Sequence, residues 1–209
     1  TYRFQHLYLP LVYGLTAFGF FVRDFKVFFT GKSDAFHQYP KFRTGDAIQF
    51  WVGKVLFLGM YLVIPMFLFP WWQVLIGFFT VLFTVGVTLA YIFQLAHVMD
   101  GADFPEPSGD PLKLENEWAV HQVQTTVDFA PRNKLLNWYA GGLNFQVEHH
   151  LFPHICHVHY PRIAPIVKAT CDEFGLKYLV YDTWPEALAS HWRAVKRLGE
   201  KPTVVAQPA

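Results

Sequence analysis

The longest apolar stretch of the chain runs from Val55 to Met99 and contains no Asp, Glu, Lys or Arg. One membrane crossing takes about 20 apolar residues, so this stretch is long enough for two. It predicts transmembrane helices at residues 52–70 and 74–96, joined by a tight turn, PWWQ, at residues 70–73. The two tryptophans suit the aromatic belt of a membrane interface. The alternative is a buried hairpin of a water-soluble protein, and the length without charge argues against it.

A shorter apolar run, LYLPLVYGLTAFGFFV, covers residues 7–22. Pro10, Gly14 and Gly19 interrupt this run, and basic residues follow it. The run therefore predicts a helix that lies in the membrane interface and does not cross the bilayer.

Basic residues outnumber acidic ones before the hairpin, whereas the PWWQ turn carries no cation. By the positive-inside rule, both flanks of the hairpin are expected in the cytosol and the turn outside or in a lumen. The basic residues are Arg3, Arg23, Lys26, Lys32, Lys41, Arg43 and Lys54, against Asp24, Asp34 and Asp46.

After the hairpin the pattern predicts a helical cytosolic cap. Residues 115–130 have a helical pattern, apolar residues recur at helical spacing from Ile163 to Phe174, and LKYLVY (176–181) is a short extended segment. Thr183 is the expected cap of a last helix that ends at Gly199. The predicted fold class is all-α integral membrane: one transmembrane helical hairpin, an interfacial helix and a helical cytosolic cap. We expect one domain over 1–209, with 1–50 interfacial or cytosolic, 52–96 the hairpin and 97–200 the cap.

Composition supports the membrane class. Of the 209 residues, 53% are hydrophobic and only 16% are charged, well below the quarter that is usual in soluble domains. The net charge of +1 gives no indication of a nucleic-acid partner. Two cysteines, Cys156 and Cys171, are too few for a disulfide scaffold and fit a reducing, cytosol-facing location.

Five of the ten histidines lie between residues 149 and 159. On a helix, positions i, i+3 and i+4 share a face, so QVEHH directs Gln146, His149 and His150 to one side. Two neighbouring imidazoles can bind one metal or two adjacent metals, and the ligand type does not name the ion. The alternative is an exposed histidine pair without metal. His97 ends the second apolar helix, which would return it to the side of QVEHH.

Four segments resemble the membrane fatty acid desaturases, in particular the front-end branch, which includes bacterial acyl-CoA or linoleoyl-CoA-type enzymes. The third histidine box of that branch is QxxHH, which Gln146, His149 and His150 match letter for letter. The box lies within one of the four segments, GGLNFQVEHHLFP. The other three are FQLAH, WAVHQVQTT and HYPRIAPIV.

The resemblance implies an O2-dependent enzyme that introduces a cis double bond into a fatty acyl chain at two irons held by histidines on the cytosolic face. It implies an acyl-CoA or acyl-lipid substrate within membrane lipid, and cytochrome b5 or a ferredoxin as electron donor. Carried over by motif, His97, His149 and His150 are metal ligands, and Gln146 is a catalytic residue at a position where many relatives have a ligand. Residues expected beside the ligands are His121, His154 and His157.

The first two boxes of the family, HxxxH and HxxHH, are absent, and His6 and His37 stand alone. The chain therefore resembles the C-terminal portion of a desaturase, and we expect it to be inactive in isolation because it lacks ligands for two irons. Two alternatives stay open: a non-catalytic membrane fragment or pseudoenzyme, and a related acyl-chain hydroxylase or acetylenase.

Overall fold

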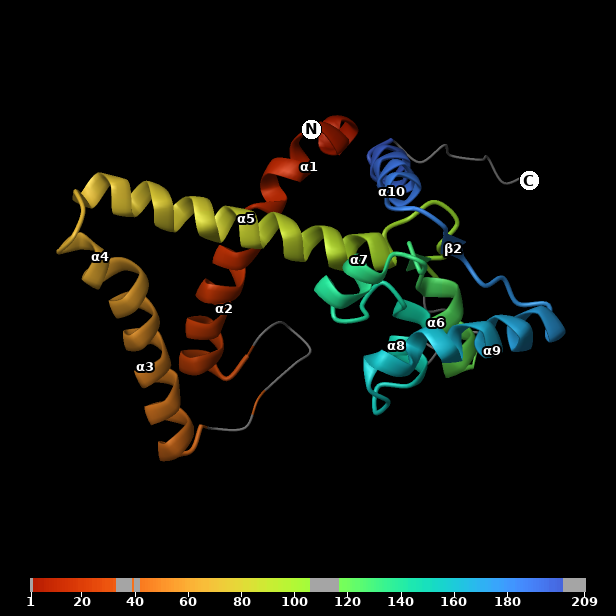
Figure 1. The fold of residues 1–209 in the computed structure, drawn as a ribbon, viewed down its shortest axis with the longest axis horizontal. Coiled ribbons are helices and arrows are strands. Elements are labelled where there is room, and N and C mark those ends of the chain that lie inside the picture. Colours follow the sequence, from red (N-terminus) through yellow and green to blue (C-terminus); the bar gives the residue numbers. More distant parts are fainter. Residues whose placement is uncertain (1, 33–38, 40–41, 106–116, 201–209) are drawn as a thin grey trace, which may run out of the picture. The chain divides into compact units, whose positions relative to one another are not determined.

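The computed structural model describes residues 2–32, 39, 42–105 and 117–200, which are mostly helical (Figure 1). The chain divides into two compact units. One comprises Pro10–Ala90, and the other combines Thr1–Leu9 with Tyr91–Ala209. All the histidines discussed as candidate site residues belong to the second unit.

The apolar run near the N-terminus forms two helices in place of one. A 3-10 turn, η1 (Tyr2–Phe4), leads into α1 (Gln5–Tyr13), and α2 (Thr16–Thr30) follows after a break. The break lies at Gly14, where any side chain would collide with the ring of Phe83. Whether these helices lie in a membrane interface stays a prediction.

Two helices in the described part of the chain are long and apolar enough to cross a membrane. The first, Thr44–Met66, combines α3 (Thr44–Leu58), the π-helical segment η2 (Gly59–Val63) and α4 (Ile64–Met66). The second is α5 (Trp71–His97). At 1.5 Å per residue both exceed the roughly 30 Å of a bilayer's hydrocarbon core. That the two helices form a hairpin across a membrane remains a prediction.

The predicted bounds of these helices were wrong at several ends. The first helix begins at Thr44, before the expected 52, and ends at Met66. The turn lies at residues 67–70, because the carbonyl of Pro70 accepts from the N–H groups of Gln73 and Val74 and so begins α5. The π-helical segment ends two residues before Pro65, whose missing N–H breaks the regular hydrogen-bond ladder.

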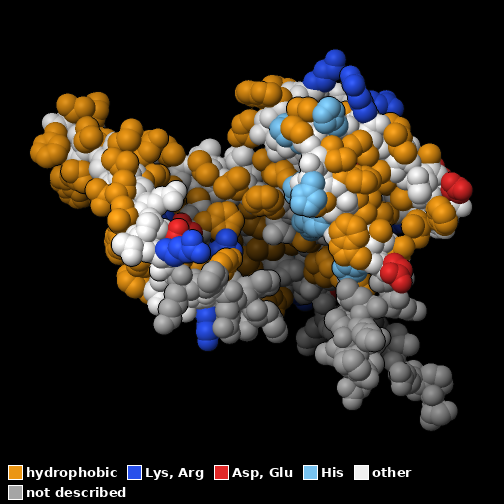
Figure 2. Space-filling view, turned by 90° about the horizontal axis from the view of Figure 1, so that it is seen from below, with side chains coloured by type: hydrophobic (Ala, Val, Ile, Leu, Met, Phe, Trp, Pro, Cys, Tyr) orange, Lys and Arg blue, Asp and Glu red, His pale blue; other side chains and the backbone are white. Residues whose placement is uncertain are grey.

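The side chains of both long helices are largely uncovered. In the most apolar 18-residue stretch of each helix, 0% of the residues of the first helix and 17% of those of α5 are buried. Figure 2 shows hydrophobic side chains over much of the face it presents. Exposed apolar surface on this scale requires a hydrocarbon environment or a partner.

The second unit contains short helices and a minimal sheet. The sheet pairs β1 (Asp128–Phe129) in parallel with β2 (Val180–Tyr181). The all-α class fits the mostly helical chain, and these two-residue strands are its one departure in the described residues; β2 lies in the segment predicted as extended. The strand β1 also replaces the end of the helix predicted at 115–130, of which 115 and 116 lie outside the described residues. The remaining elements are α6 (Trp118–Thr125), α7 (Lys134–Tyr139), α8 (Gln146–Leu151), η3 (His157–His159), α9 (Tyr160–Glu173) and α10 (Trp184–Leu198).

The prediction for α10 is confirmed in its details. The Thr183 side chain accepts from the N–H of Glu186, whose carboxylate accepts in return from the Thr183 N–H. Such a reciprocal cap fixes the first turn of the helix. The helix ends at Leu198, and Gly199 follows it.

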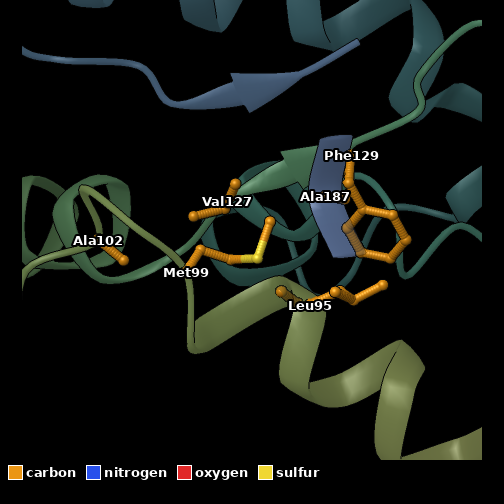
Figure 3. Close-up of a cluster of buried hydrophobic side chains, with 7 residues drawn as sticks. Leu95, Met99, Ala102, Val127, Phe129 and Ala187 are labelled. Atoms are coloured by element: carbon orange, nitrogen blue, oxygen red, sulfur yellow. The ribbon is translucent and has the colours of Figure 1, made fainter. Parts of the chain in front are cut away.

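Two buried clusters hold the cap together. The larger one joins the end of α5 to β1 and α10, with Leu95, Met99, Phe129 and Ala187 among its members (Figure 3). The smaller one joins α6, α8 and α9 through Val123, Val147, Val167 and Cys171. The last turn of α5 is therefore part of the cap's core, and its final residue is His97.

Candidate functional site

The QVEHH segment forms the helix α8. Gln146 is buried with 4% of its surface exposed, and His149 and His150 are half-buried. One helical turn separates Gln146 from His150, and their Nε2 atoms lie 3.0 Å apart. Of the three side chains expected on one face, Gln146 and His150 are in contact, whereas His149 contacts Tyr160 instead.

His97 comes to the same place from α5. Its Nε2 atom lies 3.1 Å from Nε2 of Gln146, and its ring centroid lies 5.1 Å from that of His150. The amide nitrogen of Gln146 therefore sits between the two imidazoles. The juxtaposition of His97 with QVEHH, predicted from the sequence, is present.

His149 points to a neighbouring position. Its ring lies 5.8 Å from that of His150, and its Nδ1 atom is 3.5 Å from the hydroxyl of buried Tyr160. It makes no hydrogen bond to Gln146 in the described structure. The two histidines of the pair therefore have different neighbours: Gln146 for His150 and Tyr160 for His149.

Oxygen acceptors fix the tautomers of His97 and His150. Nδ1 of His150 lies 2.6 Å from the side-chain oxygen of Gln122, and Nδ1 of His97 lies 3.5 Å from the carbonyl of Thr125. An oxygen acceptor pairs with N–H, so we assign the proton to Nδ1 in both rings. Both Nε2 lone pairs then accept from the Gln146 amide.

The electrostatics keep this site neutral. Burial and, to a smaller extent, the nearby imidazoles of His97 and His149 together lower the pKa of His150 to about 4. His150 is therefore uncharged at neutral pH, which is the form that binds metals. The Oε1 atom of Gln146 is buried without a hydrogen-bond partner in the described structure.

Beneath α8 lies a group of buried acids. Asp128 accepts from the N–H of Val147 at 3.0 Å, and the Tyr178 hydroxyl lies 2.5 Å from Asp128 and 3.0 Å from Glu148. Burial and the neighbouring Glu148 raise the pKa of Asp128 well above its usual range, and burial raises that of Glu148. The Tyr178 hydroxyl has one proton to donate, so the raised pKa values favour protonation of one of the two carboxyls.

The remaining predicted residues lie apart from these contacts. His121 is half-buried, and its Nδ1 atom has no hydrogen-bond partner in the described structure. His154 and His157 are exposed, and His157 packs against Gly142. Of the two isolated histidines, His6 packs edge-on against Trp192, and His37 lies outside the described residues.

Sequence reasoning missed Gln122, Asp128 and Tyr178. Gln122 stands in WAVHQVQTT, where its neighbour His121 was chosen as the residue of interest. The sequence signal that could have drawn attention to Asp128 was an acid placed between two apolar residues, Val127 and Phe129, which the structure shows to be buried. Nothing in the sequence around Tyr178 indicated its contacts.

No three His, Cys, Asp or Glu side chains in the described ranges lie close enough together to hold a metal ion. The site instead offers two imidazole Nε2 atoms, which both lie within hydrogen-bond distance of the Gln146 amide nitrogen. Donors of this kind suit a transition metal, although a complete coordination sphere needs about four to six.

A mostly helical chain with two apolar helices long enough to cross a membrane, and with clustered histidines at the end of the second, has the features of a membrane protein with a candidate metal site. A sequence profile of the family "Fatty acid desaturase" matches residues 2–182, and the chain belongs to this family.

Similar proteins include two that are named sn-1 linoleoyl-lipid 6-desaturase. The protein from Arthrospira platensis is 38% identical over 202 residues, which are 96% of this chain and 54% of the relative. The protein from Synechocystis sp. is also 38% identical, over 95% of this chain and 56% of the relative. The acyl-lipid (8-3)-desaturase of Physcomitrium patens is 39% identical over 95% of this chain and 41% of its own length. The chain thus spans about half the length of these relatives. No solved structure is significantly similar to it.

Proposed function

We propose that this chain forms part of a fatty acyl desaturase site, which introduces a cis double bond into an acyl chain with O2 at two irons. Family membership supports the reaction class. The observation that carries the proposal is the meeting of the Nε2 atoms of His97 and His150 at one carboxamide, at the end of a membrane-length helix.

The donor atoms fit iron in kind. Imidazole is a usual ligand of iron, and both rings are oriented through their Nδ1 atoms, as metal-bound histidines generally are. Rotation of the Gln146 amide would turn its unpartnered oxygen toward the same point. His149, on the adjacent position, is the proposed ligand of the second iron. Further ligands must come from groups that the described residues do not gather.

Iron with O2 supplies the oxidising power to remove two hydrogen atoms from unactivated carbons, which acid and base side chains cannot do. The residues of this chain hold the lone pairs in place and keep the site uncharged. His121, His154 and His157 stay proposed as neighbours of the completed site.

The proposed substrate is an acyl chain carried on a membrane lipid. The names of the Arthrospira and Physcomitrium relatives, linoleoyl-lipid and acyl-lipid desaturases, support this carrier over acyl-CoA. Cytochrome b5 or a ferredoxin is the proposed electron donor, on the family resemblance. We further propose a multi-pass membrane protein with the site on the cytosolic side, because cations precede the hairpin and are absent from its turn.

A chimera tests this function. The 209 residues replace the matching segment of the Arthrospira relative, and the chimera is expressed in a host that supplies linoleoyl lipids. We expect desaturated acyl chains among the lipids, measured by gas chromatography and mass spectrometry, and loss of the product with His150→Ala. A hydroxylated product would favour the hydroxylase alternative. A chimera that reaches the membrane without iron or product would favour the non-catalytic one.

The isolated chain gives a separate expectation. Because its described donors are too few for two irons, the purified 209-residue chain should bind fewer than two irons tightly and should desaturate nothing. Elemental analysis after removal of loosely bound metal measures this. Two retained irons per chain would contradict the ligand count.

A further inference from the structure

The short helix α6 supplies an oxygen acceptor to each imidazole that faces Gln146. The side-chain oxygen of Gln122 lies 2.6 Å from Nδ1 of His150, and the backbone oxygen of Thr125 lies 3.5 Å from Nδ1 of His97. The Thr125 carbonyl is available because the last four carbonyls of a helix have no partner within it. The shorter contact is the side-chain one, which substitution can remove.

Packing holds α6 against both elements that carry these rings. The N–H of Val127 donates to the carbonyl of Ala96, at 3.0 Å, one residue before His97. Val123 is buried in the same cluster as Val147 of α8. The hydroxyl of Thr126 donates to the backbone carbonyl of Gln122 at 2.5 Å. Gln122 is therefore placed by α5 and α8 as well as by its own helix.

A neutral imidazole carries one proton, and free histidine prefers to carry it on Nε2. The arrangement around Gln146 needs the opposite tautomer, because the Nε2 atoms of His97 and His150 must present lone pairs to the amide N–H groups. We propose that Gln122 is a positioning residue that holds His150 in the Nδ1–H tautomer and so keeps its Nε2 lone pair turned to the candidate metal position. Only the metal part of this inference rests on the proposed function.

The carboxamide of Gln122 suits this task because it accepts without adding charge. A carboxylate would accept the same proton while placing a negative charge next to a half-buried ring. Gln122→Glu therefore keeps the acceptor, whereas Gln122→Leu removes it at similar size. Gln124→Leu makes the same change at the other glutamine of α6, which points to a different side of the helix and has interactions of its own, so it reports the effect of losing an amide from α6 away from His150.

The test measures the tautomer directly. The full chain, labelled with ¹⁵N-histidine and held in detergent micelles without metal, is examined by NMR at neutral pH, with the His150 signals assigned through His150→Asn. Wild type, Gln124→Leu and Gln122→Glu should show a protonated Nδ1 and an unprotonated Nε2 on His150. Gln122→Leu should move the proton to Nε2. The signals of His191, which is bonded to the Val98 carbonyl, report whether the cap remains folded.

Two results would overturn the proposal: a wild-type His150 protonated on Nε2, or an unchanged tautomer in folded Gln122→Leu. Should that variant not fold, Gln122→Glu decides, because a real contact must shift the His150 Nδ1 resonance and an absent one leaves it in place. In the chimera, Gln122→Leu should lower iron affinity about 10- to 100-fold, and Gln122→Glu should restore most of it. An inactive parent chimera would refute the proposed function and leave the tautomer result standing.

Discussion

At the scale of single residues, Asp128 supports the histidine helix from below. Its carboxyl accepts from the first turn of α8 at Val147 and from Tyr178. Asp128→Ala leaves the buried N–H of Val147 without a partner, so we expect a loss of about 1–3 kcal/mol in the free energy of unfolding, measured by denaturation in detergent. Asp128→Asn keeps an oxygen for that N–H and should lose less. Equal losses in the two variants would contradict this role.

His191 gives the cap a dependence on acidity. Burial lowers the pKa of its imidazole below the usual 6.5. The unfolded chain therefore takes up a proton below about pH 6.5 while the folded chain resists it, so the free energy of unfolding falls as the pH drops, by at most about 1.4 kcal/mol per pH unit for one proton. A melting series from pH 7 downward measures this fall. His191→Gln should make it shallower, and an unchanged slope would contradict the assignment.

The sequence predicts some residues of the site well and others not at all. Gln146 and His150 are four apart on one helix, and His97 ends an apolar helix, so periodicity alone brings them into consideration. Gln122 and Tyr178 act through partners 28 and 50 residues away. A hydrogen bond between distant polar side chains leaves no periodic pattern, and these residues became visible only in three dimensions.

At the scale of elements, two glycines bring α5 against the break between α1 and α2. A side chain at Gly86 would place its Cβ 2.5 Å from the carbonyl oxygen of Gly14. Gly86→Ala should therefore lower the melting temperature in detergent. Gly77→Ala is the control on the same helix, since nothing lies within 4 Å of its Cβ position and alanine favours a helix by about 1 kcal/mol. A loss no larger for Gly86→Ala than for Gly77→Ala would contradict the close approach.

The ends of elements were harder to predict than their existence. Apolar length identified both long helices, but α3 begins within a polar segment, TGDAIQ, where hydropathy gives no signal. The strands β1 and β2 are two residues each and pair across more than 50 positions, with Asp128 opposite Val180. A strand of two residues is too short to show an alternation of apolar and polar residues, so it can be recognised only from its pairing with the other strand.

At the scale of the whole molecule, the two free cysteines allow the proposed membrane orientation to be tested. Cys156 is exposed and Cys171 is buried, so an impermeant maleimide should label Cys156 alone. In sealed vesicles with the cytosolic face outward, we expect labelling without permeabilisation. In a Cys156→Ser chain carrying Phe67→Cys, at a residue 84% exposed in the turn, labelling should require permeabilisation. Labelling of both from one side would contradict the hairpin.

The merging of the α5 terminus with the cap core has a consequence for biosynthesis. The cluster around Leu95 and Met99 includes Phe129 and Ala187, and Gln5 bonds to the carbonyl of Val195. None of these contacts can form until the ribosome has delivered residues far downstream, and contacts so distant in sequence close slowly. During translation, the end of α5 that carries His97 is therefore synthesised before the residues that pack against it. In a nascent chain halted before α10, the apolar side chains around Leu95 and Met99 would lack part of their cover and would be accessible to chaperones and proteases.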